Sequence, residues 1–180
     1  MSKRPSAASG VVLLCYDGSG DAAGAIAKAG ELLSPRDAVV LTVWEPVRLW
    51  EPWDPATIIS IPLAKLAAHE LDLDEVLAGI AADKATEGVA RARAAGFEAT
   101  SRLAKGKVWQ AVCELADELD AEPIVLGSRG LGRAGAALLG SVSAAVIAHT
   151  QRPVLVGHQP SARAEQHSSS DRRAATAEQR

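Results

Sequence analysis

The stretch from Ile124 to Val156 constrains the fold more than any other part of this 180-residue chain. Ile124–Leu126 is a short apolar run that stops at a glycine, as a buried strand does. Closely spaced glycines follow, namely Gly127, Gly130, Gly132, Gly135 and Gly140. An apolar helical segment begins at Ser141, and Pro153–Val156 is typical of a strand. This order of strand, glycine-rich loop, helix and strand predicts one part of a parallel α/β sheet.

The glycine-rich loop and the helix after it are typical of an anion-binding site. Where side chains are small, backbone N–H groups can approach a ligand closely. The unpaired N–H groups and the dipole of a helix N-terminus favour negative charge, and Arg129 and Arg133 add positive charge nearby. We therefore expect a nucleotide phosphate chain to bind here. The alternative, a loop that only turns a corner, rarely needs so many glycines.

Three glycine codes overlap in this loop. Gly130–Gly135 matches GxGxxG, but it lies in the last βα unit, and no acidic residue follows at the spacing of a dinucleotide site. Gly135–Ser141 matches half of a P-loop and lacks its lysine. The third code runs from Gly127 to Ser141 as glycine-x2-glycine-x9-glycine-serine. It resembles the ATP-binding signature of the universal stress protein family, in its nucleotide-binding branch.

The rest of the chain alternates apolar runs with segments of helical periodicity, which predicts right-handed βαβ units. The resemblance covers roughly Val11–Gly157. It implies a doubly wound, Rossmann-like α/β fold, with five parallel strands in the order 3-2-1-4-5 and helices on both faces. The expected strands are Val11–Cys15, Val39–Trp44, Phe97–Leu103, Ile124–Leu126 and Pro153–Val156. The expected helices are about Asp21–Leu33, Leu63–Ala95 with a break near Leu71–Asp74, Val108–Leu119, and one from Ser141.

The nucleotide is expected at the carboxyl ends of strands one and four, where the strand order reverses. Asp17 follows strand one, and the matching aspartate of the family contacts the nucleotide. An aspartate here can also cap the next helix or hold the turn. In the family, the residue at the position of Val43 uses its backbone to bind the adenine edge. The candidate nucleotide-binding residues are Asp17, Val43, Leu126, Gly127, Arg129, Gly130, Gly140, Ser141, Val142 and Ser143. The implied ligand is ATP, alone or with Mg²⁺.

A dinucleotide site is the alternative near the N-terminus. Gly18–Gly24 loosely resembles a dinucleotide fingerprint, and Glu45 at the end of strand two could hold a ribose. That arrangement would make the chain an NAD(P)-binding Rossmann protein. Against it, Asp17 places negative charge where a pyrophosphate would lie, and little chain remains for a substrate domain.

Three segments are expected to stand apart from the nucleotide-binding domain of residues 11–157. Residues 1–10 are small and polar and predict a flexible leader. Residues 158–180 have almost no large apolar side chain and predict a disordered tail. Residues 44–62 hold three tryptophans and several prolines, so they form either a lid or partner patch or a segment packed on the protein's own helices.

Charge and cysteine content exclude several classes of function. A net charge of −3 gives no electrostatic support for nucleic-acid binding. No apolar run is long enough to span a bilayer, and no signal peptide opens the chain. Cys15 and Cys113 lie within apolar patterns, which favours buried free thiols over a disulfide and predicts a cytoplasmic protein.

Two function classes remain from the sequence. The first is an ATP-binding stress-response or signalling protein, whose nucleotide occupancy changes its conformation or its choice of an unknown protein partner. The second is a nucleotide-independent interaction module of the same fold. No nucleophile–base arrangement supports an enzyme, so ATP hydrolysis is expected to be slow at most. The resemblance to the family implies a dimer that pairs through the last strand. The apolar edge at Val154–Val156 also needs a partner or protection, so we expect a homodimer.

Overall fold

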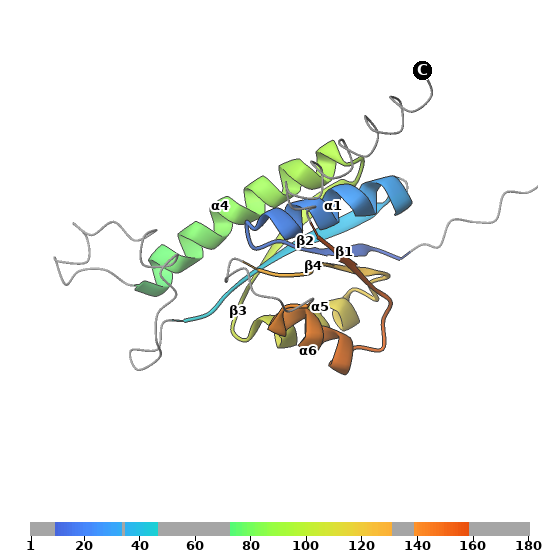
Figure 1. Cartoon of the computed structure of the whole chain (residues 1–180). Coiled ribbons are helices and arrows are strands. Elements are labelled where there is room, and N and C mark those ends of the chain that lie inside the picture. Colours follow the sequence, from blue (N-terminus) through green and yellow to red (C-terminus); the bar gives the residue numbers. More distant parts are fainter. Residues whose placement is uncertain (1–9, 34, 47–72, 131–138, 159–180) are drawn as a thin grey trace, which may run out of the picture.

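Five parallel strands form one sheet in the order β3-β2-β1-β4-β5, as Figure 1 shows. Leu13 of the central strand pairs with Val39 on one side and with Ile124 on the other. The predicted fold class and strand order are confirmed. The strands are β1 (Val12–Cys15), β2 (Asp37–Trp44), β3 (Glu98–Lys105), β4 (Ile124–Gly127) and β5 (Val154–Gly157).

The computed structural model describes residues 10–33, 35–46, 73–130 and 139–158. The expectations for the leader, for residues 47–72 and for the tail beyond residue 158 therefore lie outside the described residues. The same holds for Gly132, Arg133 and Gly135 of the glycine-rich loop.

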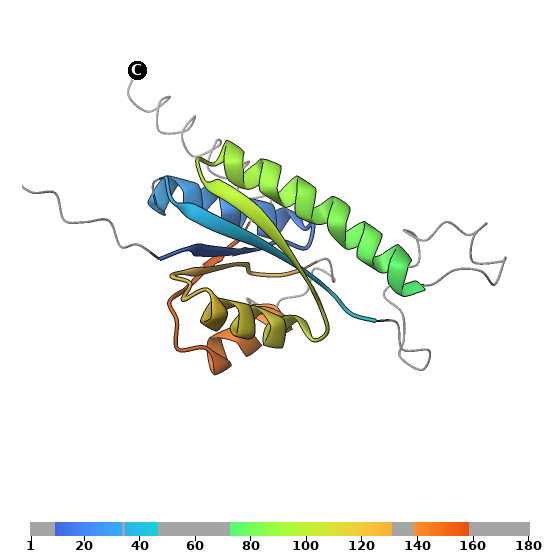
Figure 2. The same cartoon turned by 180° about the vertical axis from the view of Figure 1, so that it is seen from behind.

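In the described part of the chain, helices lie on both faces of the sheet, as the opposite views in Figure 1 and Figure 2 show. α1 (Gly20–Leu33) and α4 (Leu73–Ala94) lie on one face, and α5 (Val108–Glu118) and α6 (Ser141–His149) lie on the other. The side-chain oxygen of Ser19 begins α1 by accepting the Ala22 N–H at 3.1 Å. Gly96 follows the end of α4 with φ 93°, a conformation that suits glycine.

The alternation of side chains along the strands divides the core into two clusters. On β1, Val12 and Leu14 face the α1/α4 side, whereas Leu13 and Cys15 face the α5/α6 side. Val12, Leu13 and Leu14 are all fully buried. A continuous apolar strand is therefore explained by helices on both faces, as in other parallel sheets.

Backbone lies close to backbone on the α1/α4 face. A β-carbon added at Gly30 of α1 would collide with the carbonyl oxygen of Ala95. A β-carbon added at Gly157 of β5 would lie 2.6 Å from the Cα of Ala25 in α1. Glycine and alanine are therefore what allow α1 to pack so closely on α4 and on the sheet.

Candidate functional site

A cavity of about 460 Å³ opens at the carboxyl ends of β1 and β4. These two strands are neighbours in the sheet, and the strand order reverses between them, which is where open α/β sheets bind ligands. The structure brings all of the sequence-predicted site residues to the wall of this cavity. They are Asp17, Val43, Leu126, Gly127, Arg129, Gly130, Gly140, Ser141, Val142 and Ser143.

Asp17 combines a structural contact with a position in the cavity wall. Its Oδ1 accepts the backbone N–H of Ser19 at 2.8 Å, which holds the turn between β1 and α1. Its Oδ2 would lie 2.8 Å from a β-carbon added at Gly130. A larger residue at position 130 would therefore have to displace this carboxylate, so Gly130 lets the β4 loop pass beside Oδ2 while Oδ1 holds the turn.

Two hydrogen bonds tie the start of α6 to the end of β4. The N–H of Gly140 donates to the carbonyl oxygen of Ser128 at 2.6 Å, and the hydroxyl of Ser143 donates to the carbonyl oxygen of Gly127 at 2.7 Å. A β-carbon at Gly140 would lie 3.2 Å from the Ser128 oxygen. The N-terminus of α6 is thus held at a fixed place beside the β4 loop.

The N-terminus of α6 faces the cavity without a side-chain cap. Its N-cap residue is Gly140, which makes no side-chain cap hydrogen bond. Ser141, Val142 and Ser143 form the first turn and line the cavity. The first N–H groups of a helix have no carbonyl partner inside the helix, and the dipole there favours negative charge. This end of the cavity is therefore suited to an anion such as a phosphate.

Much of the remaining wall of the cavity is apolar. Sequence reasoning missed several residues of the wall, which are Cys15, Tyr16, Ala22, Leu41, Val108, Val112 and Leu139. The helical spacing of Val108 and Val112 had indicated only an inward face. Periodicity does not distinguish a residue that fills the core from one that lines a cavity within it. The aliphatic surface is suited to a flat, apolar group such as a nucleobase.

Two groups of the cavity wall, the Cys15 thiol and the Tyr16 hydroxyl, have raised pKa values. Burial raises the pKa of the Cys15 thiol, and the carboxylate of Asp17 raises it further. Burial also raises the pKa of the Tyr16 hydroxyl, together with its hydrogen bond to Glu87. Both cysteines are free thiols. Neither Cys15 nor Tyr16 is therefore an activated nucleophile at neutral pH.

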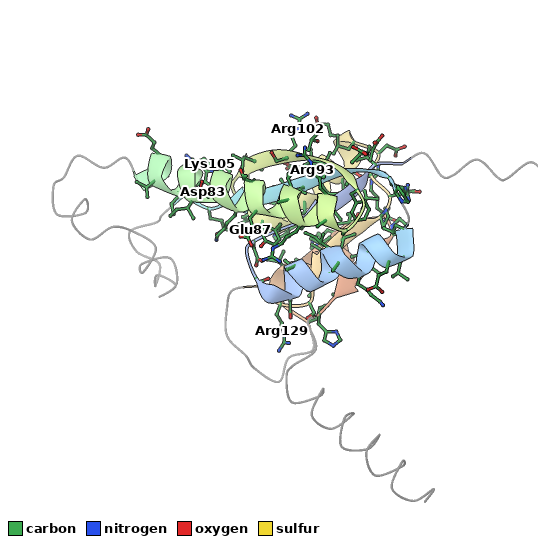
Figure 3. All side chains as sticks on the ribbon, turned by 90° about the horizontal axis from the view of Figure 1, so that it is seen from above. Asp83, Glu87, Arg93, Arg102, Lys105 and Arg129 are labelled. Carbon is green, nitrogen blue, oxygen red and sulfur yellow. The ribbon has the colours of Figure 1, made fainter. Side chains whose placement is uncertain are left out.

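An ion pair between Asp21 and Arg129 lies beside the cavity, and Arg129 contributes to its wall. Oδ2 of Asp21, in the first turn of α1, accepts the Ser128 hydroxyl at 2.8 Å and the Nε–H of Arg129 at 3.1 Å. Figure 3 shows the Arg129 side chain beside the beginning of α1, on the side away from α4. Within the described ranges, no group of three or more His, Cys, Asp or Glu residues could hold a metal ion.

The residue proposed for a dinucleotide ribose has a different neighbour. A carboxylate oxygen of Glu45 accepts the N–H of Val108, the first residue of α5, at 3.4 Å. Glu45 therefore lies at the N-terminus of a helix, where a negative charge is favoured. This contact gives Glu45 a structural role at the start of α5.

Residues 9–158 match the family model of the universal stress protein family. The chain belongs to this family. The family resemblance read from the glycine loop is thereby confirmed. A comparison with curated proteins finds no match.

Solved structures similar to this family member share its fold. Hypothetical protein MJ0577 superposes with a TM-score of 0.65 at 20% identity, over 86% of this chain and 99% of that one. A universal stress protein in complex with cAMP gives 0.53 at 24% identity, over 83% and 96% of the chains. The universal stress protein of Archaeoglobus fulgidus in complex with dAMP gives 0.54 at 18% identity, over 84% and 99%. At these identities the likeness shows the fold alone.

None of the helices in the described part of the chain has the length and apolar character needed to cross a membrane.

Proposed function

We propose that this universal stress protein belongs to the ATP-binding branch of its family and responds to stress or other signals through nucleotide occupancy. One observation carries the proposal. A cavity at the switch point of the sheet joins an apolar wall to the uncapped N-terminus of α6 and to a glycine-rich loop. Apolar surface for a base and free amides for phosphates are the two features that a nucleotide needs in one cavity.

In the proposed complex, adenine lies against the apolar wall, with the backbone of Val43 at its polar edge. The phosphates lie at the first turn of α6, from Gly140 to Ser143, and beside Gly127 and Gly130. Asp17 accepts a hydrogen bond from a ribose hydroxyl or from the adenine amino group. Magnesium would enter with the phosphates, because it is usually held by one or two carboxylates together with substrate phosphates.

Two similar structures support the choice of an adenine nucleotide. One is a complex with cAMP and the other a complex with dAMP. Both ligands share the adenine base. A triphosphate is proposed here because the glycine spacing of this chain resembles the ATP-binding signature and because Arg129 adds charge at the cavity rim.

Binding rather than catalysis is the proposed activity. Among the described residues that line the cavity, Asp17 is the one carboxylate, and one of its oxygens is engaged by Ser19. A water molecule would thus have no dedicated general base beside the phosphates. We propose that occupancy changes the conformation or the partner binding of the protein, and that hydrolysis is slow at most.

The proposed protein is a cytoplasmic homodimer whose nucleotide-binding domain spans residues 11–157. Free thiols at Cys15 and Cys113 are usual in a reducing compartment. β5 lies at one edge of the sheet and exposes part of each of its four residues. An apolar edge strand is stabilised when it pairs with another strand.

Isothermal titration of the purified protein with ATP, AMP, cAMP and NAD tests the proposal. We expect ATP to bind with the highest affinity, and NAD to bind weakly. Tight NAD binding without an ATP signal would contradict the choice of ligand. A protein that binds none of the four, yet is folded by circular dichroism, would be a nucleotide-independent interaction module instead.

A further inference from the structure

We propose that Asp21 is a positioning residue for phosphate recognition, which orients the Arg129 guanidinium toward the terminal phosphates. This inference rests on the nucleotide binding proposed above and assigns a role to a residue outside the glycine-rich loop. Asp21 precedes Arg129 by 108 positions in the sequence. Only the fold brings the two side chains together.

The carboxylate is better buried than the arginine that it holds. The Asp21 side chain is 12% exposed, whereas the Arg129 side chain is 37% exposed. The same oxygen, Oδ2, accepts the Ser128 hydroxyl at 2.8 Å and Arg129 Nε at 3.1 Å. Asp21 is therefore fixed from two neighbouring residues of the β4 loop, and Arg129 extends from it toward solvent and the cavity rim.

The point of attachment leaves the outer face of the guanidinium available. Asp21 engages Nε, and within the described ranges the two Nη groups make no hydrogen bond. The Nη groups of an arginine match the oxygens of a phosphate in a planar, bidentate arrangement. An arginine held at Nε thus keeps the donors that phosphate recognition needs, in an orientation that the carboxylate defines.

The first turn of α1 and the end of β4 form a rigid base for this pair. A β-carbon added at Gly127 would lie 2.8 Å from the backbone N of Ala22 and 3.0 Å from the carbonyl carbon of Asp21. The two backbones are therefore in contact where Asp21 meets the loop. Neither can shift far without the other, so the orientation of Asp21 determines where the arginine points.

The orienting role and simple electrostatics predict opposite changes in ATP affinity when Asp21 loses its charge. A carboxylate near a phosphate repels it, so electrostatics alone predicts that ATP binds more tightly when Asp21 loses its charge. If Asp21 acts by fixing Arg129, the same change weakens ATP binding, because an untethered arginine must be ordered by the ligand. The sign of the effect therefore separates the two accounts.

The test is titration of Asp21→Asn with ATP and with adenosine. Asparagine keeps the size and one acceptor oxygen for the Ser128 hydroxyl, but it loses the charge that pairs with Arg129. We expect ATP to bind about tenfold more weakly, as for one charged hydrogen bond, and adenosine to bind as to the parent. Asp120→Asn is the matched control, because it also removes a carboxylate beside an arginine, Arg152, on another part of the surface.

A double-mutant cycle with Arg129→Gln completes the test. We expect Asp21→Asn to have no further effect on ATP binding once Arg129 is gone. Unchanged or tighter ATP binding by the single variant would overturn the inference while leaving the proposed function intact. Equal losses for adenosine and ATP would also overturn it, since they would show a general structural role. A parent protein that binds neither ligand would instead refute the proposed function itself.

Discussion

The two faces of the sheet are built on different principles, although the same strands supply both. On the α1/α4 face, Gly30 lies against the backbone of Ala95, and Gly88 lies against the side chains of Val40 and Tyr16. On the α5/α6 face, larger side chains such as Leu41 and Val112 leave a cavity open at one end. The α1/α4 face also has a pocket, lined by residues of α1 and of the end of α4 such as Gly30 and Arg91, but in the described part of the chain neither a glycine-rich loop nor a helix N-terminus contributes to its lining.

The comparison gives glycine two distinct uses in one chain. On the α1/α4 face, an added β-carbon at Gly30 or Gly88 would collide with a neighbouring backbone or side chain. In the cavity wall, a β-carbon at Gly130 would lie against the Asp17 carboxylate, and one at Gly140 would lie against the carbonyl oxygen of Ser128. Substitution on the first face is therefore expected to reduce the stability of the fold, and substitution in the loop to reduce ligand binding.

The largest effect is expected for Gly30→Val. Its β-carbon would meet the backbone of Ala95, which cannot move aside as a flexible side chain does, so we expect a loss of about 3 kcal/mol in the free energy of unfolding. Gly79→Val is the matched control, since Gly79 also lies in a helix but has no atom within 4 Å of an added β-carbon. Urea unfolding measures both. Equal midpoints would refute the close packing of this face.

For Gly140→Val, in contrast, we expect the main loss in ATP affinity and not in the stability of the fold. The added carbons would press on Ser128 and Arg129, 3.2–3.4 Å from the β-carbon, and would push the β4 loop away from α6. ATP affinity should fall about 100-fold, or about 2.7 kcal/mol, with a smaller change in stability than for Gly30→Val. If the variant binds ATP as the parent does, the loop is only a structural corner.

A smaller loss is expected for Asp17→Asn. The amide keeps an oxygen for the Ser19 N–H, so the turn remains. If the carboxylate bonds to the nucleoside, ATP and adenosine should both bind about 1–2 kcal/mol more weakly, unlike Asp21→Asn, which affects ATP alone. A loss confined to ATP with magnesium would assign Asp17 to the metal. If the Asp17→Asn variant binds ATP and adenosine as tightly as the parent protein does, Asp17 only holds the turn.

The smallest effect is expected for a proline substitution in an edge strand, and the two edges of the sheet differ. β3 is eight residues long and polar, and Arg93 donates to the Ala99 carbonyl there at 3.0 Å; Figure 3 shows Arg93, Arg102 and Lys105 on this side. β5 is short and apolar. The register and the alternation of a parallel ladder turn the N–H of Val156 outward and that of Leu155 toward β4.

Proline at Val156 should therefore weaken a β5-paired dimer without removing a hydrogen bond to β4. We expect its dissociation constant to rise about fivefold, as for one lost backbone hydrogen bond, when measured by sedimentation velocity. Leu103→Pro on the β3 edge is the matched control. A change in oligomeric state for Leu103→Pro, with none for Val156→Pro, would move the interface to β3.

The sequence predicted the elements that depend on local pattern. Ile124–Leu126 is an apolar run, and Val39–Trp44 is apolar except for Thr42. The structure contains both strands, with β2 beginning earlier at Asp37. β3 extends to Lys105 rather than ending at Leu103, because an edge strand carries polar residues that do not mark its end. α4 spans Leu73–Ala94, and the part of the predicted helix before Leu73 lies outside the described residues.

The sequence predicted those residues of the cavity wall that lie next to a glycine or a strand end. Gly127 and Gly140 are visible as a spacing, and Asp17 as the residue after a strand. The apolar wall contributed by Val108 and the pairing of Asp21 with Arg129 depend on contacts between distant segments. No periodicity encodes such contacts, and so they required the structure.

The most direct test of the account follows backbone amide shifts by NMR while ATP is added to the isotopically labelled protein. The account predicts large shifts for the amides of Gly127, Gly130 and Gly140–Ser143, where the phosphates are placed, and almost none for Gly30 and Gly88 on the opposite face. Shifts concentrated on the α1/α4 face, or small changes spread over the whole sheet, would contradict a nucleotide site at the N-terminus of α6.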